Sequence, residues 1–203
     1  YIEMCNKYGV DIRLNTEADE KTIIDLNPDE VILATGGVPI ESPIPINDAT
    51  TVQAIDVLEG KAPLGNNVVV IGGGLIGVET AEFLISQNRK VTIVEMEKEV
   101  GADMHATVRY FAMKKLAEHN VRILTETKVK EISSKGITCT GPEGNIELKG
   151  FDMIILALGT KAYNPLEEKL KDKVKSLHVI GDAVEARKAV QAIEEATVLS
   201  LAI

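Results

Sequence analysis

Short apolar runs and helically spaced apolar residues divide this chain into many brief elements. Apolar runs bounded by Gly, Pro, Asn or Ser predict strands, whereas apolar residues at helical spacing predict helices. The predicted helices span residues 1–8, 51–58, 106–119 and 184–203. The predicted strands span residues 10–14, 21–26, 30–34, 68–71, 91–94, 121–124, 128–132, 136–140, 145–148, 153–158 and 177–180. Turns rich in Ser, Gly and Pro separate the four strands from 121 to 148, which is typical of an antiparallel meander.

Two segments carry more specific expectations about burial. The apolar spacing in residues 106–119 predicts an amphipathic helix. Its inward side chains are expected to be Val108, Phe111, Met113, Leu116 and Ala117. Residues 161–175 are polar, which favours a solvated connector, with a docking patch as the alternative. Its lysines at alternating positions are Lys169, Lys171, Lys173 and Lys175.

Residues 67–96 have the layout of a strand, a glycine turn, a helix and a second strand. Gly72, Gly74 and Gly77 form a G-x-G-x-x-G directly after the apolar run 68–71. The first glycine permits a tight turn, the second lets the backbone approach a pyrophosphate, and the third lets helix and strand pack closely. The N–H groups of the first helical turn would face the phosphates. The motif predicts dinucleotide binding; alternatively, the glycines only pack an α/β unit without a ligand.

Glu95 ends the second strand, 23 positions beyond Gly72. This is close to the offset of about 20 residues at which an acid receives the adenosine ribose hydroxyls. An acid there would repel the 2′-phosphate of NADP, and residues 96–99 contain no Arg, with Lys98 the one cation. NAD(H) is therefore favoured over NADP(H). The alternative interpretation of Glu95 is a solvated strand end.

Composition narrows the classes of partner. The 203 residues carry a net charge of −9 with a pI near 4.9, so nucleic acid and anionic membrane would be repelled. No uninterrupted apolar stretch approaches the 18 residues of a membrane span. We therefore expect neither partner. The first residue is Tyr1, and no signal region follows it, so the sequence is expected to be a piece of a longer protein.

Cysteine and histidine usage indicates neither a metal site nor a redox-active disulfide. Cys5 and Cys139 lie far apart and form no C-x-x-C, so each is expected to be a small buried hydrophobe, as suits a cytoplasmic protein. The three histidines, His105, His119 and His178, lack metal-ligand spacing. No residue is predicted to be a proton-transferring catalyst.

Three strand ends match one known scheme: Thr35-Gly36-Gly37, the GGGLIG turn, and Gly181-Asp182-Ala183. The chain resembles, over nearly its whole length, the flavoprotein reductases with two dinucleotide-binding domains. The sequence IGGGLIGVETAEFL, followed by VTIVEMEKEVGADM, is similar to the C-terminal half of one group of NADH:flavin oxidoreductases. This group comprises 2,4-dienoyl-CoA reductase, 2-enoate reductase and trimethylamine dehydrogenase.

The resemblance implies an α/β fold class. A Rossmann-like NAD(P)-binding domain, with a parallel sheet plus an antiparallel meander, would be inserted in an incomplete FAD-binding Rossmann-like domain. The implied domains are residues 1–62 for the partial FAD-binding domain, 63–160 for the NAD(H)-binding domain and 161–203 for the return to the FAD-binding domain.

The resemblance also implies individual site residues. Asp182 would bond the ribityl chain of FAD, with Gly181 giving close approach, and Thr35 and Gly36 would lie near the FAD pyrophosphate or ribityl segment. Glu79 would lie near the nicotinamide. The alternatives are a plain helix cap for Asp182 and a surface helix residue for Glu79. All candidate cofactor-binding residues are Gly72, Gly73, Gly74, Leu75, Ile76, Gly77, Glu79, Glu95, Met96, Gly159, Thr35, Gly36, Gly181 and Asp182.

The parent enzyme implied by the resemblance passes hydride from NADH to FAD and onward to a reducible small molecule such as a 2-enoate or an enoyl-CoA. Its FMN-containing barrel, its 4Fe-4S cluster and its first FAD glycine turn would precede Tyr1. The expected partners are this missing N-terminal region, the substrate and further copies of the chain. The alternatives are an FAD-dependent NADH oxidase or ferredoxin-type reductase, and a non-catalytic dinucleotide-binding module.

Overall fold

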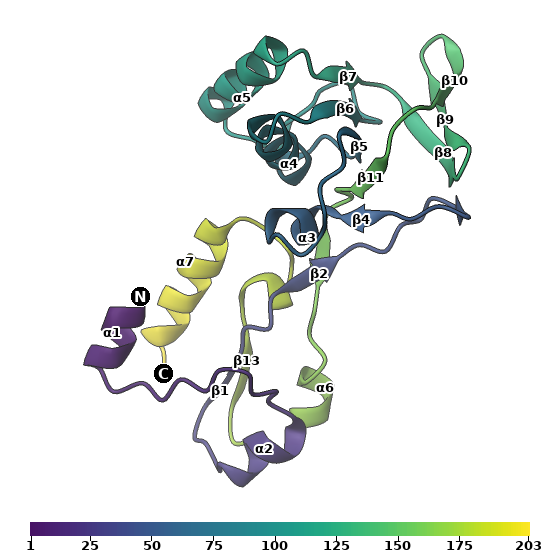
Figure 1. Cartoon of the computed structure of the whole chain (residues 1–203). Coiled ribbons are helices and arrows are strands. Elements are labelled where there is room, and N and C mark those ends of the chain that lie inside the picture. The colour runs from purple at the N-terminus through teal and green to yellow at the C-terminus, as the bar shows by residue number, and fades with distance from the viewer. The chain divides into compact units, whose positions relative to one another are not determined.

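The computed structural model describes all 203 residues, which form two compact units (Figure 1). The first unit comprises Tyr1–Gly37 and Ala162–Ile203, and the second comprises Val38–Lys161. The chain passes between them through two paired strands, β2 (Gly37–Pro39) and β12 (Thr160–Ala162).

Along the chain, the first unit gives way to the second after residue 37. The predicted boundary lies between residues 62 and 63. The difference arises from two elements of the intervening segment. Strand β4 (Val52–Gln53) pairs with the main sheet of the second unit, and helix α3 (Ala54–Leu58) buries Ala54 and Val57 in that unit's core. Residues 51–58, predicted to be one helix, are thus a short strand followed by a short helix.

The second unit is built on a five-stranded parallel sheet with the order β4-β11-β5-β6-β7. Side chains alternate across it, so that Val68 and Val70 enter one core while Val69 and Ile71 enter the other. Both faces are therefore covered, which explains the continuous apolar run in the sequence. The remaining strands of this sheet are β5 (Asn67–Ile71), β6 (Lys90–Val94), β7 (Arg122–Leu124) and β11 (Met153–Leu156).

Helices cover one face of this sheet, and a second sheet covers the other, as Figure 1 shows. The helices are α3, α4 (Leu75–Ser86) and α5 (Ala106–Glu118). The second sheet has the order β10-β9-β8-β3, and its three antiparallel strands form the part of the predicted meander that spans residues 128–148. Its strands are β3 (Ile46–Asn47), β8 (Lys128–Ser133), β9 (Gly136–Gly141) and β10 (Gly144–Leu148). The predicted α/β fold class is confirmed.

The first unit has a smaller core around two parallel strands, β1 (Val31–Leu33) and β13 (Leu177–Val179). Val31 and Leu33 pack with Leu166 and Leu170, and with the half-buried Ile23. The other elements are α1 (Ile2–Lys7), α2 (Glu20–Asp25), α6 (Glu167–Leu170), η1 (Gly181–Ala183) and α7 (Ala189–Ser200). None of the helices in either unit is long and apolar enough to cross a membrane.

Two predicted strands in the first unit are wrong. Residues 21–26 form α2, because the Asp19 side chain accepts a hydrogen bond from the Thr22 N–H at 2.8 Å and so caps a helix there. Residues 10–14 bond to no neighbouring strand and form an exposed loop, which ends in a turn where Asn15 has a positive φ of 53°.

Other boundaries and faces also differ from prediction. Residues 121–124 belong to β7 of the parallel sheet, so the meander begins at β8. On α5, Leu116 is buried and Met113 packs against the core as predicted. Val108 and Phe111, by contrast, are 54% and 62% exposed, Ala117 is exposed as well, and the helix buries Ala112 in their place. Helix α7 begins only at residue 189, after η1. The predicted connector 161–175 contains α6, whose Leu170 is fully buried.

Helix α7 has no buried residue, although much of it is apolar. Val190 and Val198 are 61% and 64% exposed. We expect the chain to self-associate in solution, because such a face and a two-stranded sheet with open edges invite a partner. Light scattering should report a molar mass above that of the monomer. In the double variant Val190→Lys, Val198→Lys, this mass should fall toward the monomer value.

Val108→Lys is the control for this expectation, because Val108 is a helical valine of comparable exposure, 54%, in the other unit. It should leave the association unchanged. Dissociation by Val108→Lys alone, or a monodisperse wild-type monomer, would contradict association through α7.

Candidate dinucleotide-binding site

The glycine turn, residues 72–77, joins β5 to α4 and admits no side chain at two positions. Gly72 has a φ of 103°, and a Cβ there would lie 2.2 Å from the Ala157 carbonyl oxygen. A Cβ at Gly77 would lie 2.0 Å from the Gly72 carbonyl oxygen. Any side chain would therefore collide with backbone, and only glycine allows the turn to pack against the end of β11 and the start of α4.

Gly74, the N-cap of α4, has more room around it. The atoms nearest to a Cβ at this position would belong to the Asp103 carboxylate, 3.5–3.9 Å away. The missing side chain thus leaves a space beside the backbone, as a cradle for a phosphate requires, and the Asp103 carboxylate borders that space. Gly73 is buried instead, and a Cβ there would lie 3.0–3.2 Å from side-chain atoms of Val100 and Glu95.

Glu95 follows β6 and ties the strand end to the glycine turn. Its side chain is almost buried, with 9% of the residue exposed. One carboxylate oxygen accepts the Gly73 N–H at 2.5 Å, and the other accepts the Glu97 N–H at 2.7 Å. A carboxylate offers about four acceptor positions, so both oxygens keep capacity for further donors such as ribose hydroxyls. Two backbone bonds hold the side chain in place to receive them.

A hollow of about 260 Å³ lies beside Glu95. Pockets that enclose a whole drug-sized ligand measure about 300–1,000 Å³, so this one suits a part of a dinucleotide. Its walls are mainly apolar, and the polar lining residues are Glu95, Glu97, Thr127 and Lys128. The lining residues are Pro43, Ile44, Ile71, Gly72, Val94, Glu95, Met96, Glu97, Thr127, Lys128, Val129 and Leu158.

The loop between β6 and α5 carries a carboxylate that sequence reasoning missed. The Leu75 N–H, the first of α4, donates to both oxygens of Asp103 at 2.9 and 3.0 Å. The loop is held there because the Gly101 N–H donates to the Gly73 carbonyl at 2.7 Å. No spacing rule in the sequence connects position 103 with the glycine turn, so only the folded loop reveals the contact.

The remaining predicted residues of the second unit are more dispersed. Ile76 and Glu79 lie on the exposed side of α4, and Met96 is 62% exposed at the rim of the hollow. Gly159 is exposed, and its carbonyl accepts the Ile40 N–H at 3.0 Å. Gly159 does not line the hollow beside Glu95.

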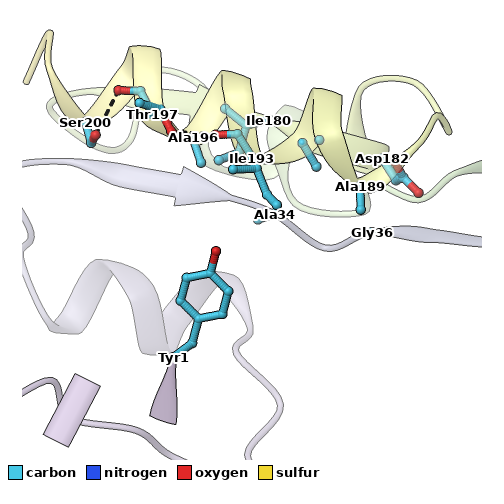
Figure 2. A pocket seen from close by; sticks show the side chains of 12 residues that line it. Tyr1, Ala34, Gly36, Ile180, Asp182, Ala189, Ile193, Ala196, Thr197 and Ser200 are labelled. Atoms are coloured by element: carbon cyan, nitrogen blue, oxygen red, sulfur yellow. Dashed lines mark hydrogen bonds between the residues drawn. The ribbon is translucent and has the colours of Figure 1, made fainter. Parts of the chain in front are cut away.

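The first unit has a larger cavity, of about 700 Å³, along α7 (Figure 2). Three of the four predicted FAD residues, Gly36, Gly181 and Asp182, line it. Figure 2 shows Asp182 and Ala189 at one end of the cavity and Tyr1 pointing toward α7. The remaining lining residues are Tyr1, Ala34, Ile180, Ala189, Ala192, Ile193, Ala196, Thr197 and Ser200.

The glycine–aspartate pair at this cavity is held by groups of the chain itself. Gly181 has a φ of 65°, and its N–H donates to Glu195 at 2.7 Å. Asp182 accepts the Arg187 N–H at 3.1 Å. Hydrogen bonds from the Arg187 guanidinium and the Gly181 N–H keep the pKa of Glu195 below its usual range. Sequence reasoning missed both Arg187 and Glu195.

Thr35, the fourth predicted FAD residue, does not line the cavity. Its hydroxyl donates to the Tyr163 carbonyl at 2.5 Å. Neither thiol lines either cavity. Cys139 is buried in the core of the second unit, where it pairs with Val129, and burial raises its pKa to about 11. Cys5 on α1 is only half-buried, contrary to the expectation that both cysteines are buried. No group of three or more His, Cys, Asp or Glu side chains is arranged to hold a metal ion.

Comparison with known proteins gives consistent matches. The family model for pyridine nucleotide-disulphide oxidoreductases matches residues 4–196. The chain is 37% identical to an NADH oxidase of Thermoanaerobacter brockii, covering 93% of this chain and 30% of the oxidase. It is 32% identical to a metal reductase of Desulforamulus reducens, covering 96% of this chain and 34% of the reductase.

The chain is also similar to a solved structure. A 2-naphthoyl-CoA reductase in complex with 2-naphthoyl-CoA superposes with a TM-score of 0.91 at 28% identity, covering all of this chain and 31% of the reductase. The chain therefore spans about a third of the length of these relatives.

Proposed function

We propose that this chain, which belongs to the pyridine nucleotide-disulphide oxidoreductase family, binds NADH at the glycine turn 72–77 and holds part of an FAD in its first unit. The observation that carries the proposal is the position of Glu95. Its carboxylate is fixed to the turn by the Gly73 N–H and stands at the edge of the apolar hollow. A nucleoside would place its base in that hollow and its ribose hydroxyls on the acid.

Glu95 also favours NADH over NADPH. Two backbone N–H groups hold its carboxylate, so it cannot swing away from an incoming 2′-phosphate. A dianion forced beside a fixed carboxylate is repelled strongly where water is partly excluded. Lys128 also lines the hollow, but no arginine does. We expect the nucleotide without the 2′-phosphate to bind more tightly.

The residues of the first unit fit part of a flavin nucleotide. Gly36 and Gly181 have positive φ and lack side chains, so a ligand can approach their backbone closely. Asp182 keeps acceptor capacity besides the Arg187 N–H and would bond ribityl hydroxyls. When bound, FAD supplies a ring that accepts hydride from reduced nicotinamide. The task left to this chain is to bind and orient the nucleotides, and no side chain needs to transfer a proton.

In the whole protein, we propose that electrons leave FAD for a reducible small molecule. A 2-enoate or enoyl-CoA is the first candidate, with FMN and a 4Fe-4S cluster carried by regions outside this chain. The structural relative that acts on an aromatic acyl-CoA supports it. The second candidate is oxidation of NADH with dioxygen, which the name of the Thermoanaerobacter brockii relative favours.

Nucleotide titration tests the proposal directly. NADH fluorescence should saturate on addition of the chain, and NADPH should bind at least about tenfold more weakly, which corresponds to about 1.4 kcal/mol. Glu143→Gln removes one exposed charge that does not line the hollow and should leave both affinities unchanged. Equal affinities for NADH and NADPH, or no saturation with either, would contradict the assignment of Glu95.

A further inference from the structure

We propose that Asp103 is an intramolecular competitor for the nucleotide pyrophosphate, so that it sets the affinity of the site for NADH. This inference rests on the proposed function of the glycine turn. It adds a residue outside the glycine motif and the acid at the strand end.

The conflict is over one hydrogen-bond donor. The N-terminus of α4 is where the G-x-G-x-x-G arrangement places a pyrophosphate, and Leu75 supplies the first N–H of that helix. Both oxygens of Asp103 already accept from this N–H, at 2.9 and 3.0 Å. An N–H has one hydrogen, so a phosphate oxygen can take this position only after the carboxylate has left it.

Electrostatic repulsion adds to this competition for the Leu75 N–H. The Asp103 carboxylate also lies within 3.5–3.9 Å of the place that a Gly74 Cβ would fill, which is the open side of the turn. Glu95 holds the neighbouring Gly73 N–H. A pyrophosphate entering here would meet two carboxylates. Glu95 is almost buried and held by two backbone N–H groups, whereas Asp103 is exposed, so we assign the displacement to Asp103.

The loop permits this movement without losing its own anchorage. Val100 is 3% exposed, and its carbonyl accepts from the Arg109 side chain at 2.8 Å. The Gly101 N–H donates a hydrogen bond to the Gly73 carbonyl oxygen at 2.7 Å. The base of the loop is therefore fixed to the glycine turn, so displacement of the Asp103 carboxylate, two residues farther along, does not require the base of the loop to detach.

Without nucleotide, the same contact serves the helix. A carboxylate at a helix N-terminus satisfies a free N–H and interacts favourably with the helix dipole. Asp103 thus stabilises the free site and opposes occupation of it. Removing the charge of Asp103 should therefore lower the stability of the free chain but raise its affinity for the nucleotide. A merely structural role would predict only the loss of stability.

Asp103→Asn is the central test, because the amide keeps the size and an acceptor but loses the charge. We expect the dissociation constant of NADH to fall roughly fivefold to thirtyfold, since a smaller fraction of the sites is blocked and a charge-assisted bond no longer has to be broken. The Tm of the free chain should fall by about 2–4 °C, because the helix loses its charged cap.

Ligand dissection locates the effect. Asp103→Asn should lower the dissociation constant of ADP-ribose, which carries the pyrophosphate, as it does that of NADH. The affinity for adenosine, which has no pyrophosphate, should stay unchanged. Glu99→Gln removes one charge from the same loop without touching the α4 N-terminus and should change NADH binding less than about twofold.

The outcomes distinguish the two levels of the argument. If the wild-type chain does not bind NADH, the proposed function fails. If it does bind and Asp103→Asn leaves affinity unchanged or weaker while the Tm falls, Asp103 is only a helix cap and the competition is refuted. Equal tightening of NADH by Glu99→Gln, or tightening of adenosine, would also overturn it by showing a general charge effect.

Discussion

Replacing Gly72 by alanine should abolish NADH binding and destabilise the second unit by about 2–6 kcal/mol. Two causes combine: the positive φ of 103° costs a residue with a Cβ about 1–3 kcal/mol, and the forced shift of neighbouring backbone costs a similar amount. The Cβ would meet the Ala157 carbonyl oxygen at 2.2 Å, so β5 and β11 must separate at their ends. Typical domains are stable by only 5–15 kcal/mol, so this is a large fraction of the total.

Gly144→Ala separates the two causes. Gly144 has a φ of 114°, close to that of Gly72, but nothing lies within 4 Å of its Cβ position. This control therefore carries the conformational strain without the collision. Chemical unfolding should show that Gly72→Ala loses more stability than Gly144→Ala, and nucleotide titration should show binding loss of more than about 100-fold only in the former. Equal losses in both variants would mean that the close approach to Ala157 is unimportant.

The layout around the glycine turn could be predicted because several local signals agree there. The apolar run of β5, the obligatory glycines and the start of α4 follow one another without a gap, and the structure reproduces their order. The resemblance to the flavoprotein reductases drawn from these residues is confirmed by the family model and by the relatives. Local chemistry and the hydrophobic pattern point to the same structure in this stretch.

The failures occur where a distant partner decides the outcome. Residues 121–124 have the composition of a meander strand, but pairing of Thr92 with Arg122 places them in the parallel sheet. Residues 21–26 are rich in β-branched side chains, yet the Asp19 cap makes them helical. Asp103 and Glu195 were missed for the same reason, because each bonds a backbone N–H far away in the sequence. Register and loop placement are properties of the folded chain.

Glu95→Arg should invert the nucleotide preference. The substitution removes the acceptor for the ribose hydroxyls and places a cation where the 2′-phosphate of NADPH would lie. Each change is worth about 1–3 kcal/mol, so the two together should raise the NADPH/NADH affinity ratio by at least about 30-fold, which is enough to invert a tenfold preference for NADH. The rim of the hollow beside Met96 gives the longer arginine side chain an exposed direction in which to extend.

The structure adds a cost that the sequence did not indicate. Glu95 holds the Gly73 and Glu97 N–H groups, and arginine cannot accept from either, so the variant should also unfold more easily by about 1–3 kcal/mol. The affinity ratio remains a clean measurement because both nucleotides are titrated into the same folded protein. Glu143→Arg introduces the same charge change at an exposed hairpin position and should leave both the ratio and the stability unaltered. An unchanged ratio in Glu95→Arg, together with the expected loss of stability, would show that Glu95 only supports the turn and that the ribose lies elsewhere.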